Sequence, residues 1–219
     1  MPYISEEQTG DIHLCAFLDM ISWSEGTCNT IHSLTKMDGY DVIVTGSDGS
    51  EIFSDFSSHP FSGGRAPKHI TGSLFSSASG RYQFLRTHWE HYRNQLKLPD
   101  FGPLSQDLWA IQLIRERGAL SDIKELRIRE AISRTANIWA SFPGAGYGQP
   151  EHKMDQLLVV FDTALNKLKK QPSTTPNEVG DIPSEVVSIF DEVKNMAENI
   201  QKIRELIEMH LSHKEILDE

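Results

Sequence analysis

Residues 16–26, AFLDMISWSEG, are the stretch that decides the fold of this chain. The residues that form its apolar stripe recur at steps of three and four, which predicts a short amphipathic helix: Ala16, Phe17, Met20, Ile21 and Ser24. Gly26 follows at the position where a glycine commonly ends a helix. We therefore expect the first buried helix of the chain to end near residue 25.

Glu25 falls on the same stripe, four residues after Ile21, where a charge is normally avoided. Burial disfavours the charged form of a carboxyl group, and the negative end of the helix dipole repels it. Both effects raise the pKa of Glu25, which is what a general acid at neutral pH requires. The alternative is an ordinary helix-end glutamate that faces water.

The composition predicts a soluble core and argues against a nucleic-acid partner. The 219 residues are 38% hydrophobic and 24% charged, which suffices for one sizeable domain and an appendage. The formal net charge is −10, and no basic cluster of the kind that binds phosphates is present. No apolar stretch approaches the ~20 residues that span a bilayer.

The N-terminus and the cysteines indicate the compartment. The start MPYISEEQTGDIH is polar and acidic and lacks the basic and apolar regions of a secretory signal. Cys15 and Cys28 flank the first helix, too far apart for a disulfide, and read as free thiols in a reducing environment. We expect the protein to accumulate in the cytoplasm of the cell that makes it.

The main domain, residues 1–170, reads as mostly helical with one small hairpin, an α+β fold. The stretches 40–45 (YDVIVT) and 51–56 (EIFSDF) predict two strands around a turn at 46–50. The Ser-, Gly- and Pro-rich stretch 57–80 predicts a long loop. Helical spacing predicts helices at 81–96, 103–118, 123–139 with a break near Leu126, and from Pro150 onward.

The C-terminal part has a different pattern. Residues 171–183 (QPSTTPNEVGDIP) read as a linker, and 184–219 as an amphipathic helix. Its apolar residues alternate steps of three and four over about three and a half heptads: Val186, Ile189, Val193, Met196, Ile200, Ile203, Ile207 and His210. This seam favours a coiled coil of three or four strands, with a homo-oligomer or another protein as partner. The alternative is a helix that folds back on its own domain.

The sequence gives little support for a metal site or for a catalytic serine or cysteine nucleophile. His88 and His91 have the spacing of two ligands on a helix, but no third ligand is evident. The chain has no GxSxG motif, and nothing marks either cysteine as activated. The GAGYG loop lacks the register of a phosphate cradle, although its glycines could let the backbone approach a ligand closely. No metal or cofactor is expected.

Carboxylates beside aromatic residues describe a glycosidase cleft instead. Glu25 lies near Trp23 in the sequence, and Asp41 follows Tyr40. Asp55 lies between two phenylalanines. Aromatic rings can lie flat against sugar faces, while carboxyl groups supply the acid and base of glycosidic bond cleavage.

Five sequence blocks, in order, carry a resemblance to a known family: AFLDMISWSEGT (16–27), GYDVIV (39–44), SGRYQF (79–84), PLSQDLWAIQLIRERGAL (103–120) and NIWASFPGAGYGQPEHK (137–153). With them the chain resembles phage endolysins of the lambda type, peptidoglycan lytic transglycosylases with a lysozyme-like fold. The resemblance covers about residues 16–161, close to two thirds of the chain. It does not extend to the linker or the heptad helix.

The resemblance implies a set of site residues. The glutamate of the SEG motif, the catalytic acid in that family, is Glu25 here. The GRYQ segment lines the glycan groove, the GYD segment borders it, and the GAGYG loop contributes an aromatic residue. These motifs imply the substrate-binding residues Tyr40, Asp41, Arg81, Tyr82, Gln83 and Tyr147. The chain departs from the family at Asp38, where the family has a histidine just before GYD.

The resemblance also implies a reaction. Glu25 would protonate the oxygen between N-acetylmuramic acid and N-acetylglucosamine, and the 6-hydroxyl of the same sugar would close to a 1,6-anhydro ring. Sequence patterns alone leave two alternatives open. One is a hydrolytic muramidase with a second carboxylate such as Asp41, and the other is a catalytically silent wall-binding or assembly protein. Without a signal peptide, the enzyme would reach the wall through a membrane lesion made by a holin.

The heptad seam leads to a first prediction. The full chain should sediment as an oligomer, and a version that ends at Lys170 should sediment as a monomer, because only the longer chain carries the seam. Analytical ultracentrifugation of both proteins at the same concentration measures this. Identical monomer masses would contradict the prediction.

Overall fold

The computed structural model describes residues 1–170, in which the chain forms seven helices and four short strands. In chain order these are α1 Glu6–Thr9, α2 Ile12–Ser24, β1 Val42–Gly46, β2 Gly49–Ile52, β3 Lys68–Thr71, β4 Leu74–Ser76, α3 Arg86–Leu96, α4 Pro103–Glu116, α5 Leu120–Lys124, α6 Ile128–Thr135 and α7 Met154–Lys169. The predicted linker at 171–183 and heptad helix at 184–219 lie outside the described residues.

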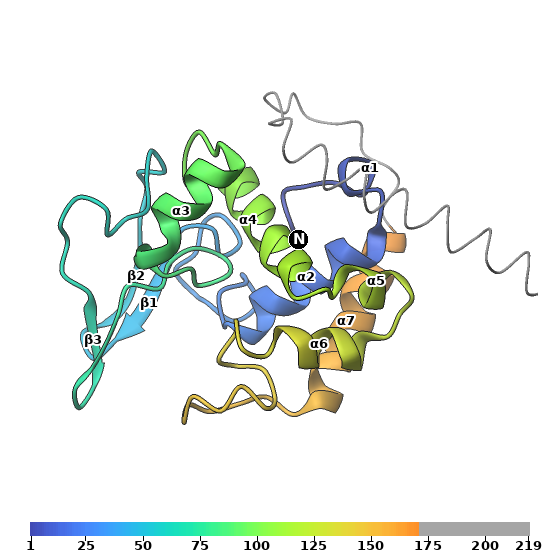
Figure 1. Ribbon diagram of the computed structural model, residues 1–219. Coiled ribbons are helices and arrows are strands. Elements are labelled where there is room, and N and C mark those ends of the chain that lie inside the picture. The colour runs from blue at the N-terminus through green and yellow to red at the C-terminus, as the bar shows by residue number, and fades with distance from the viewer. Residues whose placement is uncertain (171–219) are drawn as a thin grey trace, which may run out of the picture.

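The elements divide into a β part and a helical part, which confirms the α+β class. Figure 1 shows the hairpins at the left, α5, α6 and α7 at the lower right, and α3 and α4 between them. The helical part is built around α2, which packs against α7, α5 and α1. The main hydrophobic core lies in the helical part, and the buried strand residues Val42 and Ile43 are not among its members.

The central helix α2 is buried on nearly all sides, so the prediction of an amphipathic helix was wrong. Only Ile12, His13, Asp19 and Trp23 in this helix retain some exposure. The reason is that helices pack on α2 from several directions, so only a partly exposed strip of it is left to water. Its N-terminus is capped by Asp11, which accepts a hydrogen bond of 2.8 Å from the backbone N–H of His13.

The first hairpin is confirmed, and a second one replaces the predicted loop at 57–80. Strands β1 and β2 pair antiparallel, with Val42 opposite Ile52. Strands β3 and β4 pair in the same way around a turn at Gly72. The buried Lys68 of β3 joins the hairpins, since its Nζ lies 2.9 Å from Asp48 Oδ1 and 3.3 Å from Glu51 Oε2. These strands are too short for a clear alternation of apolar and polar residues.

Left-handed residues limit two of the predicted helices, one of which begins later than expected and the other of which breaks where expected. The helix expected from residue 81 begins at Arg86, because Gly80 (φ 79°) and Gln83 (φ 52°) form a tight turn before it. The predicted break near Leu126 is present, since this residue has φ 58° and separates α5 from α6. Residues with positive φ cannot continue a right-handed helix.

Neither a disulfide nor a membrane-spanning helix occurs in the described residues. Cys15 and Cys28 are both buried and free, as expected. Burial raises the pKa of the Cys15 thiol to about 12, so it stays protonated and unreactive. Within residues 1–170 every helix is too short or too polar to cross a membrane.

The turn at Gly80 fixes how the hairpins meet α4. The buried side chain of Gln106 accepts a hydrogen bond of 2.8 Å from the backbone N–H of Arg81. It donates to the carbonyl oxygens of Tyr40 and Phe101 at 3.0 and 2.8 Å. A Cβ atom on Gly80 would lie 2.2 Å from Gln106 Oε1. Only glycine fits here, because the left-handed φ and the close contact both exclude a side chain.

Replacing Gly80 by alanine should therefore lower the free energy of unfolding by about 2–4 kcal/mol, through the clash and the positive φ together. Gly118→Ala is the matched control, since Gly118 has φ 67° but open space around it. It should cost only about 1 kcal/mol. Urea denaturation of both variants measures the difference, and equal losses would show that the contact with Gln106 is unimportant.

Candidate active site

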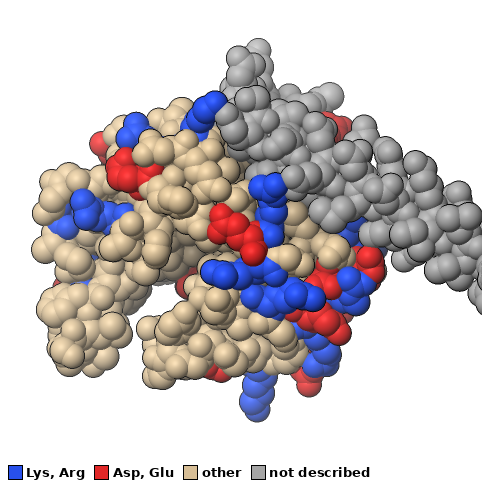
Figure 2. Space-filling model, in the orientation of Figure 1, with Lys and Arg blue, Asp and Glu red and all other residues tan. Residues whose placement is uncertain are grey.

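A groove with a volume of about 510 Å³ separates the hairpins from the segment 137–149. Figure 2 shows it as an open notch between the hairpin surface at the left and the surface to its lower right. The hairpins contribute mainly apolar side chains: Val44, Ile70, Leu74 and Phe75. Helices α3 and α4 close the groove with His88, Tyr92, Trp109, Leu113 and Arg117.

Glu25 lines this groove from the C-terminal end of α2. Its side chain is partly buried, and its Oε1 accepts a hydrogen bond of 2.6 Å from Ser141 Oγ. Burial raises the pKa of Glu25 to about 7, although the side-chain and backbone hydrogen bonds from Ser141 lower it. At neutral pH this carboxyl group can both give and take a proton.

Contacts between α2 and the segment 141–152 hold Ser141 in place. Ser141 Oγ lies 2.6 Å from Ser24 Oγ, so the two hydroxyls and the Glu25 carboxyl form a chain. The backbone N–H of His152 donates to the Ser141 carbonyl at 2.8 Å. The His152 ring lies 4.8 Å from the Trp23 ring, and its Nε2 is 3.1 Å from the Ser24 carbonyl. The hydroxyl beside Glu25 is therefore fixed from both sides.

Four of the seven residues expected at the site line the groove together: Glu25, Tyr82, Gln83 and Tyr147. Tyr147 is 57% exposed, and its hydroxyl donates to the Asn137 carbonyl at 2.8 Å. Tyr82 is among the lining residues but is only 1% exposed, and its hydroxyl points into the protein toward Asp107. Gln83 is partly exposed beside it, in the turn before α3.

The other three expected residues, Tyr40, Asp41 and Arg81, are buried and do not line the groove. Asp41 accepts hydrogen bonds from the Thr35 hydroxyl and, at 2.9 Å, from the backbone N–H of Lys36. Its carboxylate therefore holds the segment before β1. These three side chains point into the protein, although residues close to them in the sequence line the groove.

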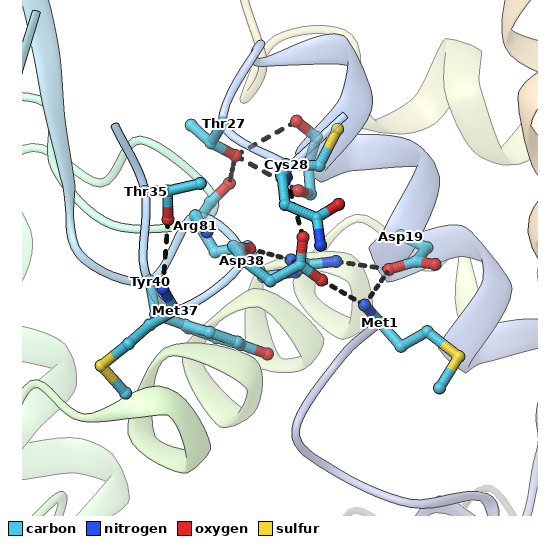
Figure 3. A network of polar contacts seen from close by, with 12 residues as sticks. Met1, Asp19, Thr27, Cys28, Thr35, Met37, Asp38, Tyr40 and Arg81 are labelled. Carbon is cyan, nitrogen blue, oxygen red and sulfur yellow. Dashed lines mark hydrogen bonds and ion pairs between the residues drawn. The ribbon is translucent and has the colours of Figure 1, made fainter. Parts of the chain in front are cut away.

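Arg81 is the centre of a buried network of charges, shown in Figure 3. Its guanidinium pairs with Asp19 of α2 and, at 3.0 Å, with Asp38 Oδ2. The amino group of Met1 contacts both carboxylates as well. Burial by itself would raise the pKa of Asp38, but Arg81 and the amino group outweigh it and lower that pKa. The departure from the family at Asp38 thus supplies a carboxylate to Arg81.

A second buried group, Asp107 of α4, anchors the two tyrosines. Its Oδ1 accepts hydrogen bonds of 2.6 Å from the hydroxyls of both Tyr40 and Tyr82, and its Oδ2 accepts one of 2.8 Å from the Ile4 N–H. Burial raises the pKa of Asp107, against the effect of these donors. Both tyrosine hydroxyls are therefore held inside the protein by Asp107, which fixes the position of the Tyr82 ring beside the groove.

The glycine loop is closed by a carboxylate of the protein itself. The backbone N–H groups of Gly144 and Gly146 each donate to Glu151 at 2.8 Å, and these bonds lower the pKa of Glu151. The amides that could have approached a ligand are therefore occupied. What the loop offers to the groove is the ring of Tyr147.

No group of three or more potential metal-ligating side chains occurs within residues 1–170. The two histidines of α3 have separate environments. His91 packs its ring 4.9 Å from Tyr92, and His88 is exposed at the groove.

Comparison with known proteins assigns the family. A family model described as Endolysin matches residues 15–168. The chain belongs to the endolysin family. The endolysin of Escherichia phage P2 is 60% identical to it over 166 residues, which cover 75% of this chain and 97% of that protein. The endolysin of Escherichia phage lambda is 52% identical over 149 residues, which cover 68% of this chain and 89% of that protein.

Solved structures confirm that this endolysin has the lysozyme-like fold. Bacteriophage lambda lysozyme in complex with a chitohexasaccharide superimposes with a TM-score of 0.64 at 51% identity, covering 70% of this chain and 94% of that one. A second structure of lysozyme from bacteriophage lambda gives a TM-score of 0.58 at 44% identity, covering 73% and 94%.

Sequence reasoning missed two side chains that shape the site of this endolysin, Ser141 and Asp107. Ser141 lies 116 residues after Glu25 and Asp107 lies 67 after Tyr40, so no local spacing connects them. Both stand inside sequence blocks that carry the family resemblance. The only local signal is a polar residue in an apolar setting: Asp107 precedes Leu108 and Trp109, and Ser141 precedes Phe142.

Ser141→Ala should raise the pKa of Glu25 above its value of about 7, because the hydroxyl that stabilises the carboxylate is lost. A carboxyl-carbon NMR titration of the labelled endolysin measures that pKa directly. Ser133→Ala is the control, since Ser133 is an exposed serine of α6 that bonds only to its own helix. An unchanged titration of Glu25 in Ser141→Ala would rule out this role.

Proposed function

We propose that this endolysin cleaves the glycan strands of peptidoglycan by lytic transglycosylation, with Glu25 as general acid and base. The observation that carries the proposal is that Glu25 is the only carboxylate lining the groove within residues 1–170. A transglycosylase needs one carboxyl group, because its nucleophile belongs to the substrate and is already in position.

The proposed reaction has two proton transfers through one side chain. Protonated Glu25 donates its proton to the oxygen that links N-acetylmuramic acid to N-acetylglucosamine, and the bond from that oxygen to the anomeric carbon breaks. The transition state has oxocarbenium character. The 6-hydroxyl oxygen of the muramic acid then bonds to the anomeric carbon, and Glu25 takes the hydroxyl proton. The products are a free 4-hydroxyl and a 1,6-anhydro sugar, and Glu25 ends protonated again.

The pKa of about 7 suits both steps. A carboxyl group with an ordinary pKa would be almost fully ionised at neutral pH and could not act as the acid. The Ser141 hydrogen bond stabilises the carboxylate that forms after the first transfer. The pKa of the proton donor is thus set by two opposing effects: burial raises it, and the Ser141 hydroxyl lowers it.

A hydrolytic muramidase is less well supported. Hydrolysis with two carboxylates places them about 5–9.5 Å apart on either side of the scissile bond. Asp41 was the candidate for the second one, but it is buried, hydrogen-bonded to residues 35 and 36, and absent from the groove. A catalytically silent protein is also disfavoured, because silence does not explain a carboxyl group with a raised pKa at the groove.

The groove residues suggest how the glycan is held. The related lambda lysozyme structure contains a chitohexasaccharide, a chain of β-linked amino sugars. We assign contacts with the sugars to Gln83 and Tyr147, which line the groove and are accessible, and we assign Tyr82 to the buried support behind them. Tyr40, Asp41 and Arg81 act as positioning residues beneath it. Access to the wall would follow a membrane lesion made by a holin.

One digest tests the proposal. Purified peptidoglycan is treated with the wild-type protein, Glu25→Gln and Asp41→Asn, and the released fragments are analysed by mass spectrometry. The wild type should release fragments with anhydro ends, each one water lighter than a reducing end. Glu25→Gln should lower the rate by about 10²–10⁴-fold, since the proton donor is lost.

Glu130→Gln, a change at an exposed glutamate of α6, is the matched control and should be fully active. Asp41→Asn should still produce anhydro ends. Reducing ends from the wild type would instead support the muramidase, and no release at all would support the silent protein. Full activity of Glu25→Gln would overturn the assignment of the catalytic residue.

A further inference from the structure

One wall of the groove carries a positive charge that a neutral sugar chain does not require. Arg117 caps the C-terminus of α4, is exposed, and lines the same groove as Glu25. Among the groove residues within 1–170, it is the only side chain with a permanent positive charge. The hydrophobic and aromatic residues around it are those expected for sugar rings.

The guanidinium of Arg117 has one acidic neighbour in the sequence, Glu116, whose carboxylate keeps its own negative charge. No ion pair of this side chain occurs within residues 1–170, and the adjacent Glu116 is engaged elsewhere. Glu116 Oε2 accepts a hydrogen bond of 2.8 Å from the Tyr92 hydroxyl, and its Oε1 accepts one of 2.8 Å from Gln112 Nε2. A helix C-terminus favours a cation in general. That preference explains the residue type but not its position at the groove.

The same wall has an unused hydrogen-bond donor. The ring of Trp109 borders the groove beside Tyr92, at a centroid distance of 5.1 Å. Its indole Nε1–H is buried and has no acceptor in the part of the chain that the structure describes. Because this N–H is buried inside the wall, the exposed guanidinium of Arg117 is the group that can reach a ligand, and it favours one that is anionic and rich in acceptors.

We propose that Arg117 and the wall between α3 and α4 bind a carboxylate of the short peptides that peptidoglycan strands carry on N-acetylmuramic acid. This inference rests on the proposed function and extends it to the substrate class. The sugars of the strand are uncharged, whereas the peptide stems have free carboxylates. Arginine binds a carboxylate through paired N–H donors, which gives orientation as well as affinity. The stem would thereby set the register of the strand relative to Glu25.

The test measures binding with the full-length Glu25→Gln protein, so that the ligand is not cleaved. Three tetrasaccharide probes of the alternating amino sugars are compared by calorimetry: one with tripeptide stems, one with the stem carboxylates amidated, and one without peptides whose lactyl carboxyl groups are amidated, so that it carries no charge. The parent should bind the first probe most tightly. Adding Arg117→Gln should weaken that binding about three- to tenfold and leave the affinity for the other two probes within about twofold.

Arg129→Gln, in the same background, is the control for net charge. Arg129 lies on α6 outside the groove and pairs with Asp155 at 2.6 Å. It should leave all three affinities unchanged. The proposal is wrong if the parent binds the three probes equally, or if Arg117→Gln weakens all of them to the same degree.

The outcome is separate from that of the digest. If the wild type releases reducing ends, the reaction assigned to Glu25 fails, while the preference for free stem carboxylates still decides whether Arg117 recognises them. If anhydro ends are released but the preference is missing, the reaction stands and the peptide site is refuted.

Discussion

The buried guanidinium of Arg81 is the constraint on which the groove depends. It lies between Asp19 of the central helix and Asp38 of the segment before the first hairpin, while its backbone bonds to Gln106 of α4 and Thr27. Removing either carboxylate would leave two positive groups, the Arg81 guanidinium and the Met1 amino group, with one negative partner. Breaking a buried ion pair commonly costs about 3–5 kcal/mol. The β part and the helical part are therefore joined by charge as well as by packing, and their separation sets the width of the groove.

With the Arg81 network in place, few further contacts are needed to position the residues of the site. The backbone that carries Tyr82 and Gln83 to the groove is fixed by Arg81 on one side and by the left-handed Gly80 on the other. Glu25 sits where α2 ends, so the position of its carboxyl follows from the most buried helix of the protein. Ser141 completes the arrangement from the far end of the sequence. Helix α2 and Ser141 thus hold the carboxyl group of Glu25, whose pKa is about 7, in a fixed position.

Much of this could be predicted from the sequence, and the limits have physical reasons. The stripe that ends in Glu25 predicted a helix and a carboxyl with a raised pKa, because helix spacing is a local property and an apolar stripe indicates which residues will be buried. The second hairpin was missed, since strands of three and four residues show no clear alternation. Tyr40, Asp41 and Arg81 were expected at the groove because their motifs border it. Which of two adjacent side chains turns inward depends on partners far away in the sequence, such as Asp107 and Asp19.

The carboxylate of Glu151 affects what happens when a ligand arrives. Gly144, Gly146 and Gly148 all have left-handed φ values, and glycines lose more conformational entropy on ordering than any other residues. Because Glu151 already binds two of their amides, this entropy is lost during folding and not during association. The aromatic edge at Tyr147 is therefore preorganised, and most of the free energy of its contacts remains available for affinity.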